Sequence, residues 1–138
     1  MAFNPHAPFI IKHVSTNTVL DIMAGSNPGK EQVILFPYNG GLNQRWTWHN
    51  GMIISQKNGL ALDISLNPGD IHAVTTWAPH GQDNQRFEIK GNGRIKSQLG
   101  LCLDARHSHG HNNLSVFGAV KRKERDGGAY QKFQLVNV

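Results

Sequence analysis

The feature that most constrains the fold of this chain is an internal repeat. The segment 19–22 (Val-Leu-Asp-Ile) recurs at 61–64 and again at 102–105, so that its aspartates are 42 and 41 residues apart (63 − 21 and 104 − 63). A period of this length is typical of a four-stranded unit. We therefore expect the 138 residues to form one domain, 1–138, with repeats at about 8–49, 50–91 and 92–138.

A second element follows the aspartate in every repeat and ends in an aromatic residue. It reads Asn-Gln-Arg-Trp at 43–46, Asn-Gln-Arg-Phe at 84–87 and Tyr-Gln-Lys-Phe at 130–133. A further aromatic stands between the two elements. Phe36 and Trp77 each precede the Asn by seven residues (43 − 36 and 84 − 77), and Phe117 is placed as their counterpart in the third repeat.

Turn residues divide the repeats into short strands. The Asn-Gly pairs at 50–51 and 92–93 lie between short β-rich segments, and Asn-Gly is a strong hairpin signal because both residues tolerate the positive φ of a type I′ turn. We expect residues 46–48 to pair with 52–54, and 87–89 with 94–96. Asn-Pro-Gly turns at 27–29 and 67–69 and the lack of a helical period then give about four strands in each repeat.

Three four-stranded units favour a closed barrel. A propeller needs about four to eight blades, whereas closure removes the exposed edges of the sheet. The sequence thus predicts an all-β domain with pseudo-threefold symmetry, in which residues 133–136 pair with 9–11. The expected core consists of Ile11, Leu20, Ile53, Leu62, Ile95 and Leu103, surrounded by Trp46, Trp48, Phe87 and Phe133.

Composition narrows the class of protein. Charged residues make up 17% of the chain and hydrophobic residues 38%, which excludes a disordered chain and predicts no membrane insertion. The single cysteine, Cys102, cannot form an internal disulfide. The N-terminus lacks the basic and apolar regions of a secretory signal, so we expect a cytoplasmic protein or one released without such a signal.

The order of these elements resembles that of a known family. Leu-Asp, a mid-repeat aromatic and Gln-x-aromatic, repeated three times, are similar to the Gln-x-Trp repeats of ricin B-chain-like lectins. The resemblance covers about the whole chain and implies a β-trefoil with one potential sugar pocket per repeat. Without paired cysteines, the chain is more similar to the disulfide-free lectins of fungi and invertebrates than to secreted plant toxins.

The resemblance also implies site residues. The sugar-binding candidates are Asp21, Phe36, Asn39 and Asn43 in repeat one, Asp63, Trp77, His80 and Asn84 in repeat two, and Asp104 and Phe117 in repeat three, where Tyr130 replaces the Asn. Gln44, Gln85 and Gln131 match a structural glutamine. A carboxylate accepts hydrogen bonds from two hydroxyls, and an aromatic ring covers the apolar face of a galactose-type sugar.

The expected function is therefore a multivalent, non-catalytic lectin, or agglutinin, for glycans ending in galactose or N-acetylgalactosamine. A glycoside hydrolase needs two carboxylates about 5–10 Å apart, and each repeat offers one. We expect no cofactor, no metal and no nucleic-acid partner, and family habit suggests a homodimer. The alternating histidines at 107–111 fit a polar loop or an adventitious zinc site.

The basic run at 121–125 leaves a second function open. Net charge is +5, and much of the excess lies in this Lys-Arg-Lys-Glu-Arg run. Such a run is usually a solvated loop, but it also fits contact with an acidic glycan, a phospholipid head group or nucleic acid. The alternative function is a β-trefoil interaction module that binds a protein, an acidic glycan or an inhibited enzyme through this loop.

Overall fold

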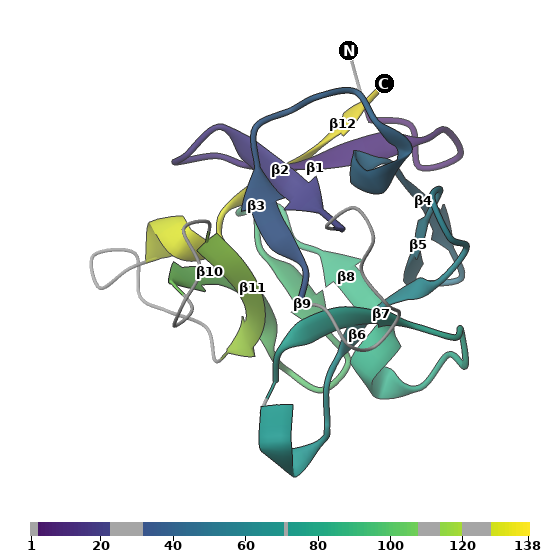
Figure 1. Cartoon of the computed structure of the whole chain (residues 1–138), viewed down its shortest axis with the longest axis vertical. Helices are drawn as coiled ribbons and strands as arrows, with labels where there is room; N and C mark the ends of the chain where they lie inside the picture. The colour runs from purple at the N-terminus through teal and green to yellow at the C-terminus, as the bar shows by residue number, and fades with distance from the viewer. Residues whose placement is uncertain (1–2, 23–31, 71, 108–113, 120–127) are drawn as a thin grey trace.

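The computed structural model describes residues 3–22, 32–70, 72–107, 114–119 and 128–138 (Figure 1). Within these ranges the chain forms twelve strands and only short 3-10 turns, so the fold is all-β. The strands are β1 (Phe9–His13), β2 (Thr18–Asp21), β3 (Ile34–Phe36), β4 (Trp46–His49), β5 (Met52–Ser55), β6 (Ala61–Ile64), β7 (Val74–Trp77), β8 (Phe87–Ile89), β9 (Ile95–Ser97), β10 (Cys102–His107), β11 (Leu114–Ala119) and β12 (Phe133–Asn137). The 3-10 turns are η1 (Leu42–Gln44), η2 (Pro68–Asp70), η3 (Asp83–Gln85) and η5 (Gly128–Gln131).

The first and last strands of each repeat form a barrel. In repeat one, Phe9 of β1 pairs with Trp46 of β4. In repeats two and three the same junction is closed by the N–H of Phe87, which donates to the carbonyl of Gly51 at 2.8 Å, and by the N–H of Phe133, which donates to the carbonyl of Gly93 at 2.8 Å. Hairpins β4–β5 and β8–β9 and the pairing of β1 with β12 complete the ring.

The second and third strands of each repeat form a cap at one end of the barrel. The three cap hairpins, β2–β3, β6–β7 and β10–β11, meet around the pseudo-threefold axis. The N–H of Val33 donates to the carbonyl of Val74 at 2.7 Å, and the N–H of Val116 donates to the carbonyl of Val33 at 2.9 Å. Barrel and cap together make a β-trefoil, and Val33, Val74 and Val116 occupy equivalent positions in it.

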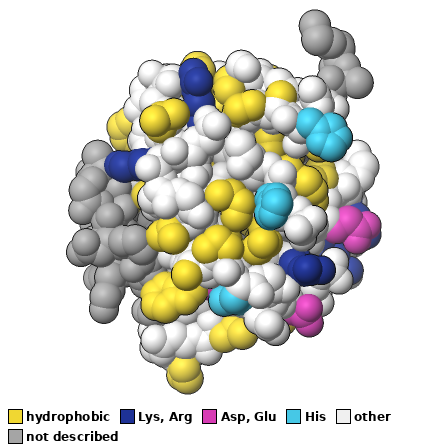
Figure 2. Space-filling model, turned by 90° about the vertical axis from the view of Figure 1, so that its right-hand side faces the viewer, with side chains coloured by type: hydrophobic (Ala, Val, Ile, Leu, Met, Phe, Trp, Pro, Cys, Tyr) yellow, Lys and Arg dark blue, Asp and Glu magenta, His cyan; other side chains and the backbone are white. Residues whose placement is uncertain are grey.

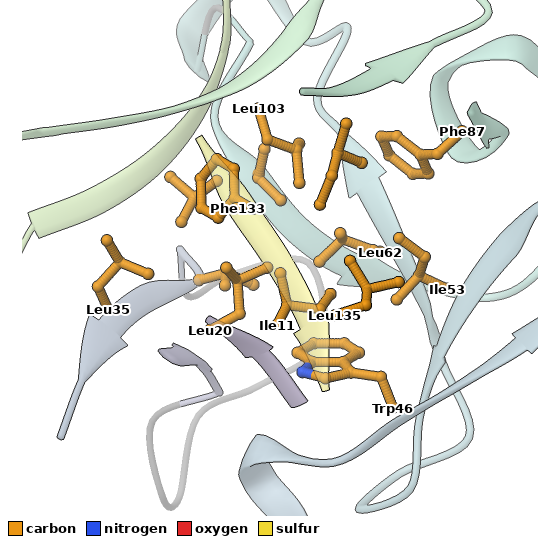
Figure 3. Close-up of a cluster of buried hydrophobic side chains, with 14 of the residues drawn as sticks. Ile11, Leu20, Leu35, Trp46, Ile53, Leu62, Phe87, Leu103, Phe133 and Leu135 are labelled. Atoms are coloured by element: carbon orange, nitrogen blue, oxygen red, sulfur yellow. The ribbon is translucent and has the colours of Figure 1, made fainter. Parts of the chain in front are cut away.

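The core lies where the barrel meets the cap (Figure 3). All six residues predicted to meet at the axis are completely buried, as is Trp46, while Phe87 and Phe133 are almost so. Trp48 is only partly buried and packs against this cluster. Because each repeat supplies the same apolar positions, the packing is shared almost equally among the three units.

The hairpin at 50–51 is confirmed, and the one at 92–93 differs from the prediction. Asn50 and Gly51 have φ of 50° and 82°, as a type I′ turn requires. In the other hairpin only Gly93 has a positive φ, 89°. There the carbonyl of Lys90 accepts the N–H of Gly93 at 3.1 Å, and the N–H of Lys90 donates to the carbonyl of Arg94 at 2.8 Å, so the loop is one residue longer than a two-residue turn.

The two ends of the chain form one hairpin, as predicted. Strands β1 and β12 pair along five residues, from Phe9 with Asn137 to His13 with Phe133, and Figure 1 shows both termini on the same side. Residues 27–29, a predicted turn, lie outside the described part of the chain. Within that part, no helix is long and apolar enough to cross a bilayer.

Candidate functional site

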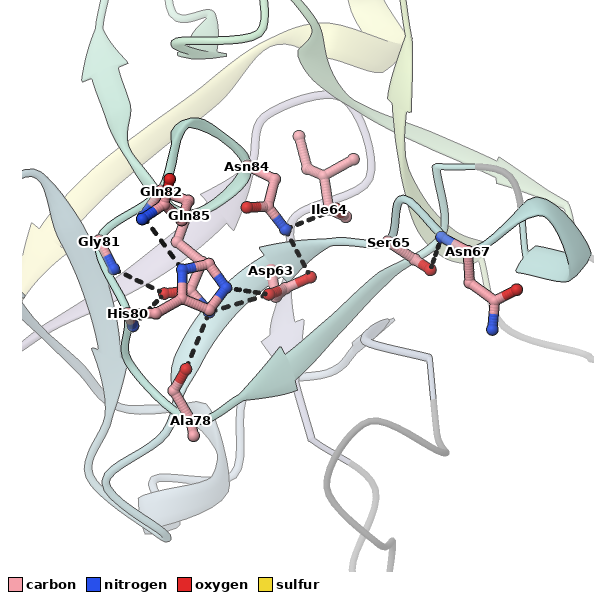
Figure 4. A network of polar contacts seen from close by, with 10 residues as sticks. All are labelled: Asp63, Ile64, Ser65, Asn67, Ala78, His80, Gly81, Gln82, Asn84 and Gln85. Atoms are coloured by element: carbon pink, nitrogen blue, oxygen red, sulfur yellow. Dashed lines mark hydrogen bonds and ion pairs between the residues drawn. The ribbon is translucent and has the colours of Figure 1, made fainter.

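The best defined site surrounds Asp63 in repeat two (Figure 4). Asp63 lies in β6, and η3 places two amide side chains against its carboxylate. The Nδ2 of Asn84 donates to Oδ1 at 3.1 Å, and the Nε2 of Gln85 donates to Oδ2 at 2.8 Å. Both carboxylate oxygens are thus fixed by neighbouring residues of the sequence, which explains why Asn-Gln recurs as a pair.

Gln85 connects the carboxylate to the surrounding backbone. Its Nε2 also donates to the carbonyl of Ala78 at 3.1 Å, and its Oε1 accepts the N–H of His80 at 2.9 Å and that of Gly81 at 3.3 Å. The side chain is completely buried. Buried polar groups must be paired, so Gln85 holds the end of β7, the following loop and Asp63 in one arrangement.

Burial raises the pKa of Asp63 above its ordinary value, although the bond from Gln85, the nearby His80 and the bond from Asn84 act in the opposite direction. Desolvation disfavours the ionised form of a carboxyl group. The folded protein therefore binds this proton up to a higher pH than the unfolded chain, and stability falls as pH rises through the raised pKa. The carboxylate is held in place at a cost in stability, as expected for a binding group.

Asp63 lies at the edge of an open hollow of about 310 Å³. Its other lining side chains are Ser65, Leu66, Asn67, Thr75, Trp77, His80 and Asn84. Trp77 is 50% exposed, so one face of its indole is available to a ligand. The Nδ1 of His80 accepts the N–H of Gln82 at 3.0 Å, which leaves the proton of the neutral ring on Nε2, at 3.7 Å from Oδ2 of Asp63.

Repeat one contains the same arrangement around Asp21. The Nδ2 of Asn43 donates to Oδ1 at 3.0 Å, and the Nε2 of Gln44 donates to Oδ2 at 2.7 Å and to the carbonyl of Pro37 at 2.9 Å. Burial again raises the pKa of Asp21, against the hydrogen bonds from the two amides. Phe36 is 39% exposed and lies opposite Val19, two residues before Asp21.

Asn39, a further candidate of repeat one, takes part in the hydrogen bonds of the loop that follows Phe36. The side-chain Oδ1 of Asn39 accepts the N–H of Gly41 at 2.8 Å, and the backbone N–H of Asn39 donates to Oε1 of Gln44 at 2.8 Å. Asn39 thus stabilises the loop in the way that His80 does in repeat two. Residues 23–31, which include the counterparts of Ser65 and Asn67, lie outside the described residues.

Repeat three departs from this arrangement. Asp104 is 0% exposed, and the Nε2 of Gln131 donates to its Oδ2 at 3.0 Å. Tyr130 stands where the other repeats have Asn, and its side chain is 45% exposed. The carboxylate and glutamine of the repeat are therefore retained, while the amide that faces the ligand side is replaced by a phenol.

The strand register corrects the assignment of Phe117. Phe36 lies opposite Val19, and Trp77 lies opposite Ala61, each two residues before the aspartate. In repeat three, the residue opposite Cys102 is Ala119, whereas Phe117 lies directly opposite Asp104. The equivalence of Val33, Val74 and Val116 gives the same result. Phe117 matches Phe36 and Trp77 by residue type, but Ala119, two residues later, occupies the position of the exposed ring.

Two arginines that sequence reasoning missed shape this third site. The guanidinium carbon of Arg106 lies 4.7 Å from the ring centroid of Phe117 and covers one face of that ring. The Nε of Arg94 donates to Oε1 of Gln131 at 3.3 Å. In repeats one and two, the corresponding glutamine oxygen accepts a backbone N–H instead. Neither residue belongs to a repeated motif, so only the folded chain brings them to the site.

The basic run and most of the histidine segment lie outside the residues that the structure describes. The basic run 121–125 lies beyond the described residues, as do residues 108–111 of the histidine segment. Among the residues described, no group of three His, Cys, Asp or Glu side chains is placed to hold a metal ion.

The sequence of the chain matches a known family over nearly its whole length. Residues 7–133 match the ricin-type beta-trefoil lectin domain. The chain belongs to this family. It is a carbohydrate-binding lectin domain by family, and the single cysteine agrees with the disulfide-free type. No curated protein sequence matches the chain.

Several solved structures, two of them lectins, share the fold. The C-half of an earthworm R-type lectin, solved in complex with GalNAc, is 26% identical, with a TM-score of 0.75 over 96% of this chain and 99% of that one. The designed threefold-symmetric protein ThreeFoil is 25% identical, with a TM-score of 0.74 over 95% and 99%. A ricin B-like lectin of Macrolepiota procera, in complex with lactose, is 17% identical, with a TM-score of 0.73 over 100% of both chains, a likeness of fold alone.

Proposed function

We propose that the protein is a non-catalytic lectin for glycans that end in galactose or N-acetylgalactosamine, and that it binds them through repeats one and two. The observation that carries this proposal is the grouping of Asp63, Trp77 and Asn84 around one open hollow. The GalNAc bound to the earthworm lectin supports the choice of sugar, since that protein is 26% identical to this chain.

The chemistry of the hollow suits a hexose with one apolar face. The exposed face of Trp77 covers the C–H groups of the ring, and burial of this surface contributes to affinity. The carboxylate of Asp63 accepts hydrogen bonds from two adjacent hydroxyls. Asn84, whose Nδ2 already donates to Asp63 and to the carbonyl of Ile64, offers its Oδ1 as a further acceptor. An epimer that leaves the carboxylate without a donor loses about 1–3 kcal/mol, which is the basis of the proposed discrimination between galactose and glucose.

Two such sites on one rigid domain give multivalency. A shallow site of this kind binds a monosaccharide with a dissociation constant of about 1 mM, or roughly −4 kcal/mol. Two sites that engage a glycan-coated surface together raise the apparent affinity by about 10²–10⁴. Repeat three does not contribute in this proposal, because Ala119 and Tyr130 replace the ring and the amide.

A hydrolytic function finds no matching arrangement in the site. Among the described residues, the hydrogen-bond partners of Asp21 and Asp63 are amides, whereas glycosidases pair two carboxyl groups across one bond. We therefore propose binding without turnover.

The test is calorimetric titration with galactose, N-acetylgalactosamine and glucose. Trp77→Ala is expected to weaken binding in repeat two about tenfold without a loss of stability, because the ring is half exposed. Asn43→Ala combined with Asn84→Ala removes one hydrogen bond to the ligand in each site and is expected to abolish measurable binding. Ile89→Ala, which removes a similarly exposed apolar side chain from β8, is the control. Unchanged titration of the double variant would refute the proposal.

A further inference from the structure

A second kind of hollow lies on the barrel strands of repeat three, and its lining does not include Asp104. It has a volume of about 460 Å³, and Lys90, Arg94, Lys96 and Asn92 line it together with Gly100 and Cys102. Lys90 ends the β8 side of the β8–β9 hairpin, and Arg94 and Lys96 lie on the β9 side. The hairpin therefore brings three cationic side chains to one concave surface.

The other repeats provide an internal comparison, because the register fixes the equivalent positions. Lys96 lies opposite Cys102, just as Lys12 lies opposite Val19. Arg94 precedes Lys96 by two residues and therefore corresponds to Ile10 of repeat one. Ile10 pairs with Val136, and Lys90 takes the place of Val136 opposite Arg94. Repeat one forms the same hollow, of about 480 Å³, with an apolar floor and Lys12 as its cation.

Repeat two carries fewer cations still at these positions. His49, Met52 and Ile54 correspond to Lys90, Arg94 and Lys96 by the pairing of β4, β5 and β6. The concentration of positive charge is therefore a property of repeat three and does not follow from the fold.

Arg94 is the fixed part of this surface. It is only 3% exposed, and its Nε donates to Oε1 of Gln131 at 3.3 Å, which anchors the guanidinium in the wall of the hollow. Guanidinium groups match the geometry of tetrahedral oxyanions, while lysines act as adaptable point charges. Among the described residues, one acid lies beside these lysines. Glu88 lies opposite Lys96, and its Oε1 is 2.8 Å from Nζ of Lys90, in an exposed ion pair.

We propose that this hollow binds a sulfate or phosphate ester carried by a sugar, separately from the galactose-type sites. An exposed ion pair such as Lys90 with Glu88 is weak, so Lys90 can turn to an incoming oxyanion. Ligand pockets span about 300–1,000 Å³, so the hollow has room for a single sugar unit, whose hydroxyls can bond to Asn92.

The test is an NMR titration of the ¹⁵N-labelled protein with galactose 6-sulfate, galactose 6-phosphate, inorganic sulfate and uncharged galactose, at constant ionic strength set with chloride. The backbone signals of Gly91, Asn92 and Gly100 are expected to shift and saturate with at least one of the two esters, and to remain unchanged with galactose. The ester that binds with the higher affinity shows whether the hollow prefers a sulfate or a phosphate group. Because these signals do not report on Asp21 or Asp63, the result is independent of galactose binding.

Matched variants then test the assignment. Lys90→Gln with Lys96→Gln is expected to weaken ester binding about 25-fold, at roughly fivefold for each lysine. Lys12→Gln removes the corresponding lysine of repeat one and is expected to change nothing. Equal shifts in the hollows of both repeats, unchanged binding by the double variant, or a response to inorganic sulfate without one to either ester would overturn the proposal.

Discussion

Replacement of Gln85 by alanine tests whether this buried side chain organises the sugar site. It would remove one hydrogen bond to an ionised carboxylate, at 2.8 Å, and leave the carbonyl of Ala78 and the N–H of His80 without their partner. A bond to a charged group contributes about 1.5–3 kcal/mol, and a neutral one about 0.5–1.5 kcal/mol. Water that enters the cavity replaces part of this loss, so we expect a destabilisation of about 3–4 kcal/mol.

Equilibrium unfolding in urea measures this quantity directly. A small domain has a total stability of about 5–15 kcal/mol, so the variant is expected to remain folded and to give a complete transition. Gln44→Ala removes the equivalent bonds in repeat one and should lose a similar amount, while Gln134→Ala, at an exposed position of β12, should change stability by less than about 0.5 kcal/mol. A loss below about 1 kcal/mol in both buried variants would refute the assigned role.

Three further predictions concern pH, packing and the third repeat. Because burial raises the pKa of the two site aspartates, galactose affinity measured by calorimetry should fall on acidification at a higher pH than an ordinary aspartate would give, while their contribution to stability increases there. Gly118→Ala should cost about 1–3 kcal/mol in urea unfolding, since its Cβ would lie 2.8 Å from Cγ2 of buried Ile64, whereas Gly91→Ala meets open space and should cost nothing. Ala119→Trp should not create a third galactose site by calorimetry, because Tyr130 still replaces the amide.

The sequence predicted the repeat, the hairpins and the core because each depends on local residue types. Asn50 and Gly51 adopt positive φ by their own preference, and the apolar positions recur with the period of the chain. The Asn-Gly pair at 92–93 was misjudged, because Gly91 and the Asn92 side chain, which accepts the N–H of Arg94 at 3.1 Å, allow a longer loop.

The arrangement of the candidate site residues was predictable where the repeats agree and less so where they differ. Asp63, Asn84 and Gln85 converge as the repeated motif implied, whereas Phe117 was misplaced because β11 contains its aromatic at a different register. The stacking of Arg106 and the cationic hollow around Arg94 depend on side chains that no periodicity connects. These contacts join residues that are not part of any repeated motif and that only folding brings together, so a single sequence does not reveal them.

The two carboxylate oxygens of each aspartate have different partners, and this difference affects how the number of sugar sites in such a protein is counted. One oxygen is bonded to a glutamine that supports folding, and the other faces the asparagine on the ligand side. Repeat three keeps the first bond, from Gln131 to Asp104, although it has lost both the asparagine and the exposed ring. A tally of Leu-Asp motifs would therefore overstate the number of working sites, and the ring and the amide give the better count.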